Sequence, residues 1–365
     1  MLGFRKGPTR EQVLEALRDV QDPELHRSIV DLDMVRDVQI RDGAVRVEAL
    51  LTITGCPLRE TIVRSIEERV RRLPGVERVE VHLGVMTPEQ RQALVEKLRG
   101  SQAPDRPASF LRPESGVRVL AVASGKGGVG KSTVTANLAA ALARRGRRVG
   151  VLDADVYGFS IPKMLGIQGR PTVIDQMILP LERDGVRAIS MGMLVDAGEA
   201  VIWRGPMLHK ALATFIQEVH WGDVEVLLLD LPPGTGDVSI SIAQMLPWGE
   251  MIIVTTPQEA AVEVAQRAAR MAEKVGMRVA GVIENMSYYR PHPEADPVYL
   301  FGKGGGRVLA ERIGTELLAE IPLDPRVREG SDRGEPVVRT HPDSPAAQAF
   351  FQAADRLLAQ TRARR

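Results

Sequence analysis

The chain has 365 residues, of which 44% are hydrophobic and 26% charged, a composition typical of globular, water-soluble proteins with two or three domains. Lys plus Arg (48) almost equals Asp plus Glu (47), and this balance excludes the strongly basic class of nucleic-acid-binding proteins, so we expect no nucleic-acid partner. One cysteine excludes an intrachain disulfide, and the polar N-terminus and the lack of a long apolar run predict a cytoplasmic protein without signal peptide or membrane span.

The first part of the chain predicts a small α+β domain over residues 1–99. Thr9 has the character of an N-cap, and Val13, Leu14 and Leu17 follow it at helical spacing. The elements expected after this helix are a hairpin of strands 38–40 and 45–54 around an Asp-Gly turn, a helix over 58–73, a strand over 76–83 and a helix over 88–98.

A polar stretch that contains several prolines, residues 100–115, predicts a linker, because it has too little apolar surface to fold. The remainder, 116–365, alternates short Val/Ile/Leu-rich runs with helical patterns. The expected strands are 117–123, 148–152, 224–230, 251–255, 279–284 and 317–321, and the expected helices are 131–145, 207–219, 239–246, 259–275, 306–313 and 345–358. This alternation predicts an α/β domain with a doubly wound, mostly parallel sheet.

A glycine-rich segment with the sequence GKGGVGKST follows the first of these strands and opens a helix, as a phosphate-binding loop requires. Its members are Gly125, Lys126, Gly127, Gly128, Val129, Gly130, Lys131, Ser132 and Thr133. The glycines allow backbone N–H groups to face phosphates, Lys131 is expected to neutralise the β- and γ-phosphates, and the Ser132 hydroxyl is expected to bind Mg²⁺. We therefore predict a nucleoside triphosphate site with Mg²⁺.

Carboxylates end two of the predicted strands. Asp153 and Asp155 follow one strand, and Asp230 ends the next. Ligands of open α/β sheets bind at the carboxyl ends of the strands, so these groups are expected at the nucleotide site.

Lys126, the lysine after the first glycine, resembles the signature lysine of the MinD, ParA and nitrogenase-iron-protein superfamily of P-loop ATPases. The resemblance implies a homodimer in which Lys126 reaches the partner's phosphates, like an arginine finger. It also implies that Asp155 positions the attacking water, that Asp230 holds Mg²⁺ through water, and that Gly234 senses the γ-phosphate. By the same resemblance, Asn285 contacts adenine and the loop with Pro322 and Asp324 flanks the base. The resemblance also implies ATP rather than GTP, and Glu284–Ser287 is not the Asn-Lys-x-Asp loop that GTPases usually show.

Further motifs resemble the Mrp/ApbC family of iron–sulfur cluster carrier ATPases. They are Trp203–Met207 (WRGPM), Asp230–Asp237 (DLPPGTGD), Glu284–Ser287 (ENMS), Phe301–Gly306 (FGKGGG) and, in the first domain, Asp22–Leu25 (DPEL) and Thr54–Pro57 (TGCP). The resemblance covers nearly the whole chain. It implies an ATP hydrolase that transfers iron–sulfur clusters to apo-proteins or other assembly factors.

The sequence departs from this family in its cysteines. Many members carry a Cys-x-x-Cys pair shortly after the ENMS motif, but residues 287–296 contain no cysteine. Since clusters are normally held by thiolates, Cys56 in the first domain is the candidate cluster ligand, and His292 is a weaker one. The alternative function is a metal-free MinD/ParA-like ATPase switch that docks a protein partner.

Overall fold

The computed structural model describes residues 7–53, 58–99, 115–155, 158–193, 205–292 and 294–362. It divides the chain into two compact units, here called the first unit (residues 1–106 with 172–179) and the second unit (107–171 with 180–365). Of the predicted linker over 100–115, only Ser115 lies within the described residues.

The first unit is a three-stranded sheet with helices. Its elements are α1 (Arg10–Arg18), β1 (Val35–Arg41), β2 (Ala44–Leu51), α2 (Arg59–Arg71), β3 (Arg78–Val85) and α3 (Pro88–Arg99). Thr9 caps α1 as expected, since its Oγ1 accepts from the Gln12 N–H at 3.2 Å. β1 and β2 form the expected antiparallel hairpin, and β3 pairs parallel to β2. The predicted small α+β domain is confirmed.

The first unit also contains a hairpin from far along the chain, β6 (Thr172–Ile174) and β7 (Met177–Leu179). Ile174, Met177 and Leu179 are buried in the hydrophobic core of the first unit. The predicted range 116–365 includes this segment. Three-residue strands carry too little periodicity to be recognised in a sequence.

The second unit is built on an eight-stranded sheet with the order β13-β12-β11-β4-β10-β5-β9-β8. Its strands are β4 (Arg118–Ser124), β5 (Val149–Asp153), β8 (Leu181–Arg183), β9 (Val186–Ser190), β10 (Val226–Asp230), β11 (Glu250–Thr255), β12 (Arg278–Tyr289) and β13 (Leu317–Leu323). All neighbours are parallel except the edge strand β8, which pairs antiparallel to β9.

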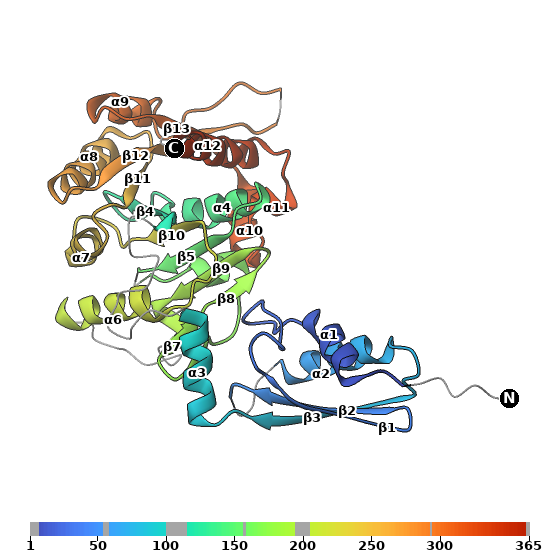
Figure 1. Ribbon diagram of the computed structural model, residues 1–365. Coiled ribbons are helices and arrows are strands. Elements are labelled where there is room, and N and C mark those ends of the chain that lie inside the picture. Colours follow the sequence, from blue (N-terminus) through green and yellow to red (C-terminus); the bar gives the residue numbers. More distant parts are fainter. Residues whose placement is uncertain are drawn as a thin grey trace. The chain divides into compact units, whose positions relative to one another are not determined.

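Helices cover both faces of this sheet, with α4, α11 and α12 on one side and α7, α8 and α9 on the other (Figure 1). The helices are α4 (Lys131–Arg144), α5 (Ile161–Leu165), α6 (Gly205–Glu218), α7 (Asp237–Met245), α8 (Glu259–Lys274), α9 (Gly305–Arg312), α10 (Pro325–Arg333), α11 (Val337–Thr340) and α12 (Pro345–Arg362). The doubly wound, mostly parallel α/β fold is thus confirmed. Within the described residues, no helix combines the length and apolar character that a membrane crossing needs.

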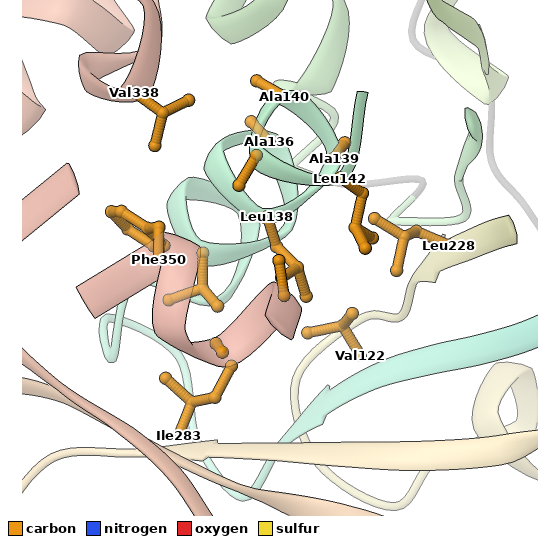
Figure 2. Close-up of a cluster of buried hydrophobic side chains, with 14 of the residues drawn as sticks. Val122, Ala136, Leu138, Ala139, Ala140, Leu142, Leu228, Ile283, Val338 and Phe350 are labelled. Carbon is orange, nitrogen blue, oxygen red and sulfur yellow. The ribbon is translucent and has the colours of Figure 1, made fainter. Parts of the chain in front are cut away.

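The core of the second unit fixes the helix that follows the phosphate loop. Small and branched side chains of α4 pack with α12 and with strands β4, β10 and β12, as Figure 2 shows for Leu138, Phe350 and Val122. Leu138 is fully buried, so its replacement by Ala would cost about 2–5 kcal/mol. This packing holds the N-terminal end of α4 at the carboxyl edge of the sheet.

Candidate nucleotide site

The loop between β4 and α4 adopts a conformation that depends on its glycines. Gly128 and Gly130 both have φ of 82°, a left-handed conformation that other residues rarely adopt. A Cβ on Gly125 would lie 2.4 Å from the backbone N of Ala265, and one on Gly130 would lie 2.3 Å from Nδ2 of Asn285. The predicted phosphate loop is therefore wrapped tightly against α8 and the end of β12.

The side chains predicted to hold the phosphates and Mg²⁺ converge at the start of α4. The Lys131 Nζ lies 2.7 Å from Asp230 Oδ2, and the Ser132 hydroxyl donates to the same oxygen at 2.6 Å. Lys131 is 6% exposed and Asp230 is fully buried. Removing one partner of such a buried ion pair leaves the other charge uncompensated, at a typical cost of about 3–5 kcal/mol. Lysine, hydroxyl and carboxylate thus form one connected cluster.

Asp153 is the last residue of β5, and Asp155 lies just beyond it, next to this cluster. The Asp155 Oδ2 is 4.0 Å from the Lys131 Nζ, and its Oδ1 accepts from the Gly158 N–H at 3.1 Å. Asp153 is fully buried and accepts from the backbone N–H groups of Ser160 and Ile161. Burial, with the charge of Asp230 as the second cause, raises the pKa of Asp153 to about 7.

Lys126 and Asn285 also border the loop. The Lys126 Nζ donates to Gln258 Oε1 at 3.2 Å, so this lysine lies against the N-cap of α8. The Asn285 amide donates to the Val129 carbonyl at 2.8 Å and so joins the end of β12 to the phosphate loop.

Gly234, predicted to sense the γ-phosphate, has φ of 88° and donates its N–H to the Ser124 carbonyl at 2.9 Å. Pro322 lies in β13, and Asp324 follows it as the N-cap of α10. The Asp324 carboxylate accepts from the Arg326 N–H and pairs with the Arg326 guanidinium at 2.7 Å. Asp324 thus orients the start of α10.

Two residues of this site were missing from the sequence prediction. The Thr135 hydroxyl donates to Asp230 Oδ1 at 2.6 Å, and Gln258 holds Lys126. Thr135 lies one helical turn after Lys131, on the same face of α4, and this i,i+4 spacing was an available signal. No sequence signal pairs Gln258 with Lys126, since they are 132 residues apart.

The candidate cluster ligands do not form a site in the described part of the chain. Cys56 and the rest of the Thr54–Pro57 motif lie outside the described residues. His292 is exposed. Among the residues that the structure describes, no group of three or more His, Cys, Asp or Glu side chains is arranged to hold a metal ion.

The residues of the phosphate loop fit a nucleotide with Mg²⁺. Its glycines leave no room for a Cβ at Gly125 and Gly130. The α4 N-terminus supplies positive partial charge, and hydroxyl and carboxylate oxygens of the kind that Mg²⁺ prefers are 2.6 Å apart at Ser132 and Asp230.

Two family models match the chain. Residues 116–358 match the ParA model, described as NUBPL iron-transfer P-loop NTPase, and residues 10–83 match a model described as iron-sulfur cluster assembly protein. A Mycobacterium tuberculosis protein named iron-sulfur cluster carrier protein is 48% identical, over 99% of this chain and 96% of the relative. A Synechocystis protein of the same name is 42% identical, over 94% and 95%.

Solved structures agree with this grouping. A nucleotide-binding protein in complex with ADP from Archaeoglobus fulgidus is 37% identical, covers 64% of this chain and 91% of its own, and has a TM-score of 0.55. The cell division ATPase MinD of Pyrococcus furiosus is 25% identical over 67% and 99%, with a TM-score of 0.50. The phosphate loop, the carboxylate cluster and these matches lead to one conclusion: the chain belongs to the NUBPL iron-transfer P-loop NTPase family.

Proposed function

We propose that this protein is an ATP-dependent iron–sulfur cluster carrier of the cytoplasm that hydrolyses ATP and transfers clusters to apo-proteins or other assembly factors. The observation that carries the proposal is the Lys131, Ser132 and Asp230 cluster at the phosphate loop. It occurs in a chain that relatives named iron-sulfur cluster carrier protein match over almost its full length.

Each part of the site has a role in this proposal. Loop amides and the N-terminus of α4 hold the phosphates, and Lys131 neutralises their charge. Ser132 would hold Mg²⁺ and Asp230 would hold it through water, and the ion would offset the charge that develops on the phosphates. Asp155, beside Lys131, orients the attacking water. The adenine is flanked by Asn285, Pro322 and Asp324.

The active form in this proposal is a homodimer, and Lys126 acts on the partner's phosphates. Lys126 donates to Gln258 in its own protomer, so it must exchange this hydrogen bond for a phosphate oxygen of the partner's nucleotide. The exchange replaces a neutral acceptor by a charged one, and hydrogen bonds between charged groups are the stronger kind. Dimer formation on ATP thereby completes the site.

The cargo of this carrier is an iron–sulfur cluster, and Cys56 is its proposed ligand. Two protomers supply two Cys56 thiolates, because each chain has one cysteine. A cluster commonly takes four thiolates, so two of its coordination positions would fall to other groups or to the acceptor protein. A cluster held in this way would be labile, which suits a carrier.

The test is anaerobic reconstitution of the full chain with iron and sulfide, comparing wild type with Cys56→Ser. We expect bound iron and acid-labile sulfide in the wild type and a loss of both in the variant. His292→Ala tests the weaker candidate ligand, and we expect this variant to keep the wild-type iron content. Equal cluster loading in wild type and Cys56→Ser would remove Cys56 from the proposal.

A second function has one observation in its favour: the chain, with one cysteine, lacks a Cys-x-x-Cys pair. A metal-free ATPase switch that docks a protein partner would need no such pair. Wild-type protein that hydrolyses ATP but takes up no iron or sulfide would favour this function.

A further inference from the structure

The hairpin of β6 and β7 is the feature that neither family assignment nor nucleotide site explains. The chain leaves the second unit after Pro171, forms Thr172–Leu179 within the first unit, and returns at Pro180. Ile174, Met177 and Leu179 are at most 2% exposed and share a hydrophobic core with Leu94 and Leu98 of α3. The hairpin is therefore an integral part of the first unit's core.

Polar contacts hold both ends of this hairpin within the first unit. The Thr172 hydroxyl donates to Glu24 Oε1 at 2.5 Å, in the loop after α1. At the turn, the Arg91 guanidinium of α3 pairs with Asp175 Oδ1 at 3.3 Å. β7 accordingly lies beside α3 in Figure 1. Thr172 is 8% exposed, so its hydroxyl has little access to water as an alternative partner.

The other end of the connection starts at the nucleotide site. The Asp153 carboxylate accepts from the N–H groups of Ser160 and Ile161 at 3.0 and 3.2 Å, and these residues open α5. Asp153 ends β5 just before Asp155, which lies 4.0 Å from Lys131. After α5 and its cap Gly166, only residues 167–171 precede the hairpin. A short stretch of chain thus links the phosphate-site carboxylates to the first unit's core.

We propose that the hairpin Thr172–Leu179 transmits the nucleotide state of the second unit to the first unit, with α5 as the link. The inference rests on the proposed nucleotide site and adds to it a route to the unit that carries Cys56. A nucleotide that shifts the Asp153 carboxylate would move the first turn of α5, which this carboxylate holds, and the hairpin would follow. If the nucleotide changes the docking equilibrium of the hairpin by a given factor, then docking of the hairpin changes the nucleotide affinity by that same factor, because the two equilibria are linked.

The alternative hypothesis is that the hairpin joins the two units but does not respond to the nucleotide, and it predicts the opposite result. Its docking would be equal with ADP and with ATP, and loosening it would change stability without changing the relative affinity for the two nucleotides. Proximity along the chain alone does not establish coupling, so the test must measure coupling itself.

The first measurement is hydrogen exchange by mass spectrometry on the full chain with Mg-ADP or a non-hydrolysable Mg-ATP analogue, with nucleotide occupancy determined in the same samples. We expect exchange in 172–179 and in residues 20–25 to differ between the two nucleotides by about fivefold or more. Unchanged exchange at full occupancy would overturn the transmission alone. A protein that binds neither nucleotide would overturn the proposed function, and the transmission with it.

The second measurement is nucleotide affinity in matched variants. Thr172→Val removes the hydroxyl at nearly constant volume, whereas Thr172→Ser keeps it. Val173→Ala is a control on the same hairpin, because Val173 is 44% exposed. We expect Thr172→Val to change the ratio of ADP to ATP-analogue affinity about threefold or more, and the other two to keep the wild-type ratio.

Equal ratios in all three variants would overturn the proposal. If Thr172→Val proves unfolded by circular dichroism, Asp175→Asn provides the second variant, since it weakens only the exposed contact with Arg91. Asp175→Asn is expected to shift the ratio of ADP to ATP-analogue affinity in the direction expected for Thr172→Val, but by a smaller factor. An unchanged ratio in a folded Asp175→Asn protein, together with unchanged exchange in the wild type, would again reject transmission.

Discussion

The two units of this protein differ in what their chemistry requires. The nucleotide site proposed for the second unit depends on a short segment, Gly125–Thr133, whose backbone N–H groups and two side chains, Lys131 and Ser132, would do most of the binding. Iron–sulfur ligation needs several thiolates brought together, and the first unit offers one, Cys56. Backbone recognition is encoded locally, so a continuous motif predicts it. Side-chain ligation depends on tertiary or dimer contacts, so a single residue predicts much less.

The largest effect is expected for Lys131→Ala, which tests the proposed nucleotide site of the second unit. We expect ATP hydrolysis to fall by about 10³-fold or more, because the phosphates lose their positive partner. The measurement is steady-state phosphate release, with circular dichroism to verify folding, since Asp230 also loses a buried partner. Lys303→Ala serves as the control. Turnover at the wild-type rate in Lys131→Ala would show that hydrolysis occurs at another site.

The next effect concerns Lys126. We expect Lys126→Ala to lose about 10²-fold or more of the hydrolysis rate and to keep nucleotide binding, because its proposed contact is with the partner's nucleotide. A mixture of Lys126→Ala and Lys131→Ala proteins is the sharper assay. If Lys126 acts across the dimer, mixed dimers contain one complete site, and the mixture regains about a quarter of wild-type turnover. A mixture as inactive as its components would contradict action in trans.

A smaller effect, on stability, is expected for Gly125→Ala. The added Cβ would lie 2.4 Å from the Ala265 backbone N, and relieving such an overlap costs about 1–3 kcal/mol. Gly236→Ala is the matched control, since its φ of −77° suits alanine and its Cβ would meet no atom within 4 Å. Thermal unfolding measures the difference, and equal midpoints for the two variants would refute the close packing of the phosphate loop on α8.

The smallest effect, counted per pH unit, is a pH dependence of the free energy of unfolding. The pKa of Asp153 is raised from 3.8 to about 7, so between these values the folded protein holds a proton that the unfolded chain has released. This group therefore makes the free energy of unfolding fall as pH rises through the interval, by at most about 1.4 kcal/mol per pH unit. Asp153→Asn should lose this slope and the exposed control Asp296→Asn should keep it, as measured by urea unfolding at pH 5, 6 and 7. An identical slope in all three proteins would rule out the buried titration.

The same contrast explains what the sequence could predict. The six predicted strands of the second unit follow short Val/Ile/Leu-rich runs and the six predicted helices follow helical periodicity, and each has its counterpart within a few residues in the fold. Most of the elements that were missed, among them β6, β7 and α5, are three to five residues long and are fixed by tertiary contacts; the nine-residue helix α10 was missed as well. At the site, the phosphate loop and the strand-end carboxylates could be predicted from position. The Lys126 contact with Gln258 could not, because it depends on how α8 packs against the loop.

The most direct test of an ATP-dependent cluster carrier is whether ATP binding and hydrolysis change the rate of cluster transfer in the same protein. The measurement is the rate of cluster transfer from reconstituted wild type and reconstituted Lys131→Ala to an apo-ferredoxin, with and without Mg-ATP. We predict that Mg-ATP changes the wild-type rate by about fivefold or more and leaves the Lys131→Ala rate unchanged. Transfer from the wild type at one rate regardless of Mg-ATP would contradict an ATP-dependent carrier.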